Sequence, residues 1–180
     1  FLAEVLRRRL AIVDRRAGRW LERWEQDALL GLACLYGIEL LHDNVNDCRD
    51  RLHGLFSAAY EAQFGKQCRD AVLSAARHIV RCNILHGDAL KMTTVGDKVC
   101  PARPLVFTEW SMLPGGKIKR RRYEFRELTP PAPGAKPGLF ADDVEPLFCE
   151  GGKPVFMPQA IDTPPLVHYL KLAESEGSTR

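Results

Sequence analysis

The chain has no apolar run of the ~18 residues that a membrane-spanning helix needs, and its first residues lack the pattern of a signal peptide. Its six cysteines form no C-x-x-C pair, and no histidine stands at zinc-ligand spacing from them. The net charge of +3 is too small to indicate a nucleic-acid partner by itself. The sequence therefore predicts free thiols in a reducing cytoplasm, no metal site and no association with a membrane.

The composition is that of a folded domain. Hydrophobic residues make up 46% of the 180 positions and charged residues 27%, which is ordinary for a soluble globular protein. The basic residues are clustered despite the small net charge, so any case for nucleic-acid binding rests on where they lie. The two clusters are Arg7, Arg8, Arg9, Arg15 and Arg16 near the start, and Lys117, Lys119, Arg120, Arg121 and Arg122 further on.

Two helices are predicted at the start of the chain. Apolar residues recur at helical spacing over 1–16 and again from about residue 20 to residue 33, and Ala17-Gly18 separates the two patterns. The first pattern is already helical at Phe1, with no initiator methionine and no preceding cap. We therefore expect a further segment upstream.

The stretch 35–50 organises the rest of the chain. Strand-forming apolar residues over 35–41 enclose one carboxylate, Glu39, and Asp43 and Asn44 then resemble the N-cap of a helix. An acid at the carboxyl end of a parallel strand, beside a helix start, is where doubly wound α/β folds bind the ribose of a nucleotide-like cofactor. Glu39 is therefore the first functional candidate.

Two helices, predicted over 43–63 and 66–81, separate this strand from a second one over 82–90. The second strand also ends in an acid, because Gly87 and Asp88 stand at its exit. Two strands that are separated by helices and each end in an acid are typical of a parallel α/β sheet.

A β-hairpin and a proline-rich tail complete the chain. Strand-like residues on both sides of Leu113-Pro114-Gly115-Gly116-Lys117 predict a hairpin over 104–128. From Thr129 onward proline and glycine are frequent, and a few short apolar islands interrupt them. We expect one domain over 1–128, which includes the hairpin, and an extended tail over 129–180 that docks those islands on the domain.

Three segments stand in the order and spacing of a known family. They are Phe1-Leu2-Ala3-Glu4-Val5-Leu6, Tyr36-Gly37-Ile38-Glu39-Leu40 with Asp43-Asn44, and Asn83-Ile84-Leu85-His86-Gly87-Asp88-Ala89-Leu90. They resemble, in turn, the residues after the glycine-rich cofactor loop, the second cofactor motif and the third cofactor motif of the SAM-dependent DNA N6-adenine methyltransferases, especially the modification subunits of restriction-modification systems. The resemblance covers roughly the first half of the chain. It implies a partial Rossmann-like α/β methyltransferase fold, S-adenosyl-L-methionine (SAM) as cofactor, DNA as substrate and a specificity or nuclease subunit as a possible partner.

The resemblance also implies a role for each cofactor residue. Glu39 would accept hydrogen bonds from the two ribose hydroxyls, for which a carboxylate is well suited. Ile38 and Leu40 would flank it, with one of them packing on the adenine ring. Asp88 would accept from the exocyclic amino group of adenine, and Ala89 would offer its backbone N–H to a ring nitrogen. The structural alternatives are that Glu39 belongs to the cap of the next helix and that Gly87-Asp88 is an ordinary turn pair.

The sequence departs from the family at the catalytic motif. A DNA amino-methyltransferase needs Asn, Asp or Ser followed by Pro-Pro and an aromatic residue, and no such tetrapeptide follows Asp88. Thr108-Glu109-Trp110 stands in the corresponding place. Trp110 could stack on a base while Glu109 accepts from its amino group, or Trp110 could cover the sheet while Glu109 pairs with a hairpin arginine. The catalytic residues are thus left unassigned.

The basic hairpin strand also has two interpretations. It could lie along phosphates with Tyr123 or Phe125 stacking on a base, or it could be a solvated edge strand whose charges deter aggregation. The candidate nucleic-acid residues are Lys117, Lys119, Arg120, Arg121, Arg122 and Tyr123.

Three functions remain open from the sequence. The first is a SAM-binding DNA adenine methyltransferase-like protein of a restriction-modification type system. The second keeps the fold without the reaction, as a catalytically inactive module that binds DNA or a partner protein through its basic hairpin. The third is a nicotinamide dehydrogenase, because an acid after the second strand also binds the ribose of NAD.

Overall fold

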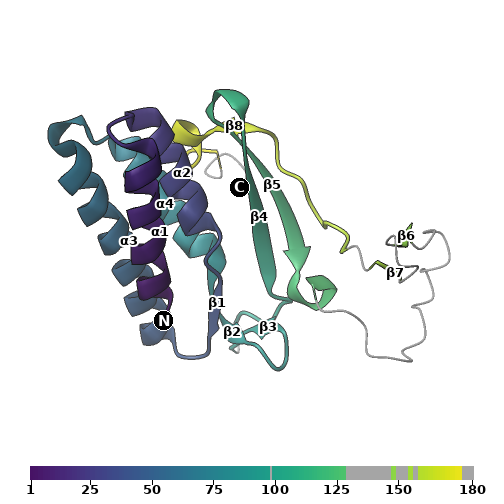
Figure 1. Cartoon of the computed structure of the whole chain (residues 1–180). Coiled ribbons are helices and arrows are strands. Elements are labelled where there is room, and N and C mark those ends of the chain that lie inside the picture. Colours follow the sequence, from purple (N-terminus) through teal and green to yellow (C-terminus); the bar gives the residue numbers. More distant parts are fainter. Residues whose placement is uncertain (98, 129–146, 149–153, 156–157, 176–180) are drawn as a thin grey trace.

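The computed structural model describes residues 1–97, 99–128, 147–148, 154–155 and 158–175. The fold is mixed α/β, with four α-helices and several small sheets in these residues (Figure 1). The helices lie together on one side, a long β-hairpin lies on the other, and the short strands β1, β2 and β3 lie at one end (Figure 1). None of the described helices is both long enough and apolar enough to cross a bilayer.

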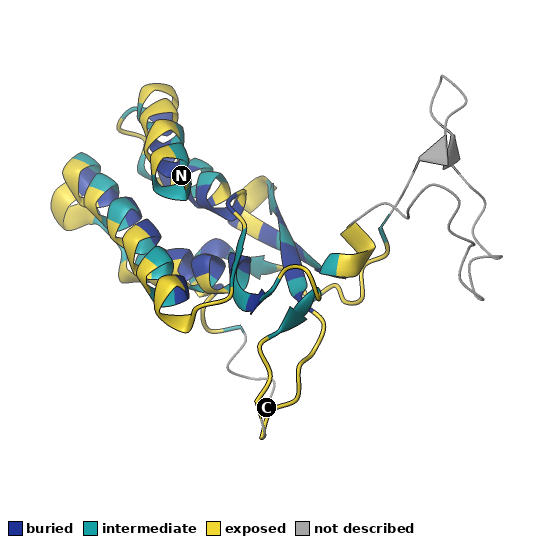
Figure 2. Cartoon of the chain, turned by 90° about the horizontal axis from the view of Figure 1, so that it is seen from below, coloured by how far each residue is buried: buried dark blue, intermediate teal, exposed yellow. Residues whose placement is uncertain are grey.

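The four helices follow the apolar periodicity of the sequence. They are α1 (Leu2–Ala17), α2 (Leu21–Ala33), α3 (His42–Phe64) and α4 (Asp70–Asn83). Each has one buried and one exposed face, as Figure 2 shows. The predicted break at Ala17-Gly18 and the predicted end of the third helix at Phe64-Gly65 are confirmed.

Two helix starts differ from the prediction. The third helix begins at His42, so Leu41 occupies the N-cap position and Asp43 lies inside the first turn, where its carboxylate accepts from the backbone N–H of Asn44. The fourth begins at Asp70 instead of residue 66, because Gly65–Gln67 forms a separate 3-10 turn. Neither start has a side-chain cap that could mark it in the sequence.

The core lies between the helices around Trp24. The indole of Trp24 is fully buried and stacks on Tyr60, with ring centroids 5.2 Å apart. Phe56 and Phe64 contact the same indole, and its Nε1 donates to Asp14 of α1 at 2.6 Å. Aromatic packing of this kind contributes stability beyond the buried area alone, so α1, α2 and α3 are fixed to one another here.

A small sheet carries the two predicted acids. β1 (Gly37–Glu39) pairs in parallel with β2 (Ile84–Asp88), and β3 (Thr93–Thr94) pairs antiparallel with β2. The parallel pairing predicted from the sequence is confirmed. β1 is shorter than the predicted strand over 35–41, because the carboxylate of Glu39 accepts from the backbone N–H of Leu41 at 3.0 Å and turns the chain.

The predicted β-hairpin is confirmed and belongs to a second sheet. β4 (Val106–Leu113) pairs antiparallel with β5 (Lys117–Glu124), and β5 also pairs with β8 (Val167–His168). The described part of the chain therefore has one parallel strand pair, β1 with β2, next to an antiparallel sheet. A mixed α/β fold is established by this arrangement, and the partial Rossmann-like fold stays a prediction.

The described C-terminal residues return to the helices through β8 and a 3-10 turn at Tyr169–Lys171. Tyr169, which belongs to the last apolar island, and Leu172 are buried in the core cluster. A further strand pair, β6 (Leu147–Phe148) with β7 (Pro154–Val155), holds parts of two other islands. The island at 139–140 lies outside the described residues.

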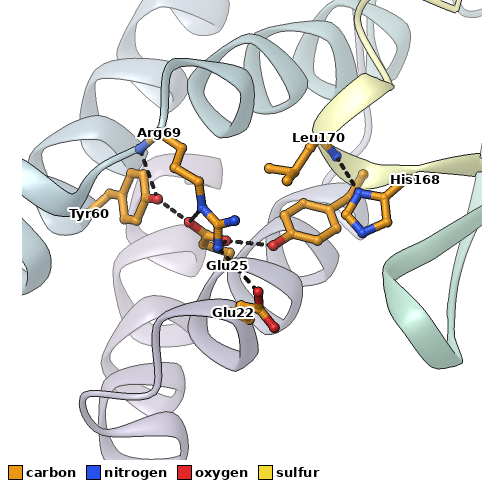
Figure 3. A network of polar contacts seen from close by, with 7 residues as sticks. Glu22, Glu25, Tyr60, Arg69, His168 and Leu170 are labelled. Carbon is orange, nitrogen blue, oxygen red and sulfur yellow. Dashed lines mark hydrogen bonds and ion pairs between the residues drawn. The ribbon is translucent and has the colours of Figure 1, made fainter.

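A buried polar network joins this returning segment to the helices (Figure 3). The carboxylate of Glu25 on α2 is fully buried and forms a bidentate pair with Arg69, at 2.9 and 2.6 Å. The hydroxyls of Tyr60 and Tyr169 donate to the same carboxylate. Burial and the bond to Glu25 raise the pKa of both tyrosines, so both stay neutral donors at ordinary pH.

Candidate functional site

The two predicted cofactor acids lie at the same edge of the parallel strand pair. Register pairs Gly37 with Ile84 and Glu39 with His86, so Glu39 and Asp88 both stand at the carboxyl ends of adjacent strands. This is the edge at which open α/β sheets bind ligands. Gly87 permits the arrangement, because a Cβ there would lie 2.7 Å from the carbonyl oxygen of Thr93 on β3.

Both acids take part in local turns. One oxygen of Asp88 accepts from the backbone N–H groups of Leu90 and Lys91, at 2.9 and 3.1 Å, and the other lies 3.3 Å from the Lys91 ammonium. These contacts, led by the Lys91 N–H, lower the pKa of Asp88 below its usual value and keep it ionised. The turn that the sequence offers as the alternative role of Gly87-Asp88 is therefore present. A carboxylate has about four acceptor positions, so this turn leaves capacity for a ligand.

The other predicted cofactor residues surround this edge. Leu40 and Ala89 are exposed, so the backbone and side chain of each can reach a ligand. Ile38 is half-buried and lines a cavity on the hairpin side of β1. His86 is the cross-strand partner of Glu39, and its Nε2 lies 3.0 Å from the carbonyl oxygen of Leu40. The strand ends thus bring Glu39, Leu40, Asp88 and Ala89 to one edge. The side chain of Ile38 lies on the other side of β1, in the cavity.

The two catalytic candidates, Trp110 and Glu109, have different environments in the structure. Trp110 is buried, and its indole N–H donates to Asn83 of α4 at 2.9 Å, so its ring packs on the helices and cannot also stack on a base. The prediction that Trp110 stacks on a base is therefore wrong. Trp110 covers the sheet, which was the alternative interpretation. Glu109 is half-exposed and pairs with Arg121 of the hairpin, which was its alternative role, but it also faces the cavity.

The arginines of the hairpin are engaged within the molecule. Arg120 is buried and donates to the carbonyl of Pro165 and the hydroxyl of Ser175, at 3.2 Å each. Arg121 pairs with Glu109, and Arg122 lies 3.3 Å from Asp162. Lys117 is exposed and Lys119 half-buried, while Tyr123 is buried and donates to Glu109. The candidate nucleic-acid residues therefore form no continuous exposed strip, although the exposed arginines Arg7, Arg8, Arg15 and Arg16 lie on α1.

A cavity of about 730 Å³ lies between β1 and the hairpin. We call it the aromatic cavity, and its named walls are Tyr36, Ile38, Phe107, Glu109, Arg121, Tyr123 and Phe125. The hydroxyl of Tyr36 donates to the carbonyl of Thr108 at 2.8 Å and ties the two walls together. Burial, with a smaller effect of nearby negative groups, raises the pKa of Tyr36 to about 12. The hydroxyl is consequently a stable donor at physiological pH.

The structure contains functional and structural residues that the sequence prediction missed. Asn83 joins three elements, because its amide donates to the carbonyl of Ala33 on α2 and accepts from Trp110 on β4. Glu25 had a signal in the sequence: it stands three, four and seven residues before the apolar positions 28, 29 and 32, on the buried face of α2. Tyr36 had none, because its partners lie about 70 residues away.

Comparison with known proteins adds no assignment. No protein-family model, curated protein or solved structure matches the chain. Among the described residues, the cysteines Cys34, Cys48, Cys68, Cys82 and Cys100 form no disulfide, and Cys149 lies outside those residues.

Proposed function

We propose that the chain is a SAM-binding, DNA adenine methyltransferase-like module of a restriction-modification type system. The observation that carries the proposal is the position of Glu39 and Asp88 at the ends of adjacent parallel strands. In the methyltransferase family that the chain resembles, the two corresponding acids bind opposite ends of one adenosine group, so they must lie at the same sheet edge. Acids that merely capped local turns would not need this register.

The geometry suits the adenosine part of SAM. Glu39 would accept from the ribose hydroxyls, since a carboxylate can take two hydrogen bonds at once. Asp88 stays ionised and would accept from the amino group of adenine, while the exposed Ala89 backbone donates to the ring. The exposed Leu40 would supply the apolar contact with the ring, because the side chain of Ile38 lies in the cavity on the other side of β1.

The second candidate is an inactive module that binds DNA or a partner without using SAM. The absence of the catalytic tetrapeptide favours it, and so does the burial of Trp110. The basic hairpin surface predicted for this binding is smaller than expected, because Arg120, Arg121 and Arg122 pair within the molecule. Lys117 and the arginines of α1 are left to contact phosphates. Binding of this kind would depend steeply on salt and would be indifferent to SAM.

Calorimetric titration of SAM separates the two candidates. We expect SAM to bind the wild-type chain and to bind Glu39→Gln at least about 10-fold more weakly, because charge-assisted hydrogen bonds are worth about 1.5–3 kcal/mol. Glu61→Gln, at an exposed position on α3, is the control and should leave the affinity unchanged. No SAM binding by the wild-type chain, or equal binding by Glu39→Gln, would contradict the proposal.

A further inference from the structure

We propose that the aromatic cavity is a nucleobase-binding site in which Glu109 and Arg121 recognise the hydrogen-bonding edge of the base. Its volume of about 730 Å³ falls within the range of small-molecule sites, roughly 300–1,000 Å³. Such sites combine mostly apolar walls with a few placed polar groups. The aromatic cavity has this composition.

The walls present aromatic rings from three segments. Tyr36 meets Phe107 edge to face at 5.5 Å, and Phe107 meets Phe125 in the same way at 5.6 Å. Tyr123 is the cross-strand partner of Phe107. Stacking on an aromatic side chain suits any planar ring. Phe107 and Tyr123 are buried, so a flat heteroaromatic ligand would stack on Tyr36, which is 40% exposed, or on the half-buried Phe125.

The polar groups of the cavity are the Glu109 carboxylate, an acceptor, and the Arg121 guanidinium, a donor, which lie side by side. Arg121 Nη2 donates to Glu109 Oε1 at 2.9 Å, and Arg121 Nε lies 2.8 Å from Oε2. The hydroxyl of Tyr123 donates to Oε2 at 3.1 Å. These contacts use three of the roughly four acceptor positions of a carboxylate and two of the five N–H donors of a guanidinium. The pair can therefore still accept one hydrogen bond and donate others side by side.

A nucleobase edge has the complementary pattern. In adenine an amino donor stands beside a ring-nitrogen acceptor, so the amino group would meet Glu109 and the ring nitrogen would meet Arg121. The side chains of Glu109 and Arg121 are 43% and 41% exposed, so a ligand can reach both. Strand alternation places these two residues on the same hairpin face as Phe107 and Tyr123, opposite the face with Trp110 and Ile118 that packs on the helices.

The cavity adjoins the proposed cofactor edge. Ile38 lines the cavity and is followed by Glu39, so a base held there lies next to the strand end that carries the acids. The identity of the base as adenine rests on the proposed function. The existence of a nucleobase site rests on the cavity walls alone.

Fluorescence anisotropy with three short labelled single-stranded oligonucleotides tests the proposal. They carry at one position adenine, purine without the 6-amino group, or an abasic site, in an otherwise identical sequence. We expect the adenine form to bind best and the purine form about 10-fold more weakly, because one charge-assisted hydrogen bond is lost. Glu109→Gln should weaken adenine binding by about the same factor and Tyr123→Phe by less, since the latter only loosens the carboxylate.

Asp162→Asn is the matched control, because Asp162 pairs with Arg122 next to Arg121 on β5. Both Glu109→Gln and Asp162→Asn remove one carboxylate from a hairpin arginine, so a general gain in phosphate binding appears in both variants. Asp162→Asn should therefore leave the ratio of adenine to purine binding unchanged. Displacement of the oligonucleotide by free adenosine would indicate that the site takes nucleosides, and failure of adenosine to displace it would indicate a base within a nucleic acid.

Equal binding of the abasic and adenine forms, or equal binding by Glu109→Gln and the wild type, would overturn the proposal. Loss of SAM binding in Glu109→Gln would overturn it as well, because the cavity would then belong to the cofactor. A wild-type chain that discriminates adenine but binds no SAM would leave this inference intact while the proposed function fails.

Discussion

At the scale of single residues, Glu25 shows how a buried charge is accommodated. Removing a carboxylate from water costs several kcal/mol, and only a full set of donors offsets that cost. Arg69 and the two tyrosine hydroxyls supply that set from α3, the start of α4 and the C-terminal segment. The network therefore makes three distant parts of the chain depend on one side chain.

Replacing Glu25 with glutamine should destabilise the fold by about 3 kcal/mol, because breaking a buried ion pair leaves the remaining partner without its counter-charge. Urea unfolding followed by tryptophan fluorescence measures the change, since Trp24 packs against Tyr60. Glu22→Gln is the control. Glu22 is 76% exposed and lies 3.9 Å from the same arginine, so its loss should cost less than about 0.5 kcal/mol. Equal effects of the two substitutions would contradict the role assigned to the network.

At the scale of elements, the hairpin turn supports the returning C-terminal segment. Gly115 and Gly116 both adopt positive φ, at 75° and 69°. A Cβ on Gly115 would meet open space, whereas a Cβ on Gly116 would lie 2.8 Å from His168 Nε2 and 3.0 Å from the ring of Tyr169. The turn of one element is thus also the docking surface of another.

Alanine at these two positions should have different effects. Gly115→Ala should cost about 1 kcal/mol from backbone strain, while Gly116→Ala should cost about 2–3 kcal/mol because Tyr169 must also move. Urea unfolding of both variants provides the comparison. Destabilisation of the same size in both would show that the segment does not rest on the turn.

The elements were predictable where one physical pattern determined them. The helices follow apolar periodicity, and the hairpin follows its Pro-Gly-Gly turn and the strand-forming residues beside it. Helix starts were missed because Leu41 and Arg69 occupy N-cap positions without a capping side chain. The predicted first strand was too long because strand propensity at Leu40 and Leu41 gives no sign of the turn that Glu39 makes.

The candidate site was predictable only in part. Glu39 and Asp88 could be placed at one sheet edge because parallel strands in a helix-linked unit share a carboxyl end. The aromatic cavity could not be predicted, because Tyr36 contacts Phe107 and Thr108 only through tertiary packing. The burial of Arg120 could not be predicted for the same reason, because its partners Pro165 and Ser175 lie far along the chain.

At the scale of the whole molecule, the described residues form a helical side, a small parallel strand pair and an antiparallel hairpin sheet (Figure 1). The acids at the strand ends and the aromatic cavity lie on two sides of β1. This arrangement suits a cofactor and a base held next to each other. The central claim is that the strand-end acids bind the adenosine part of SAM.

Equilibrium dialysis of radiolabelled SAM against Asp88→Asn and Asp97→Asn tests that claim most directly. Both aspartates are turn residues whose carboxylates accept from two backbone N–H groups, at residues 90 and 91 for Asp88 and at residues 99 and 100 for Asp97. Each substitution therefore weakens one turn of the same kind, so a general loss of stability should be similar in the two variants. We predict SAM binding at least about 10-fold weaker in Asp88→Asn and unchanged in Asp97→Asn. Equal binding by the two variants and the wild type, or none by the wild type, would contradict the account.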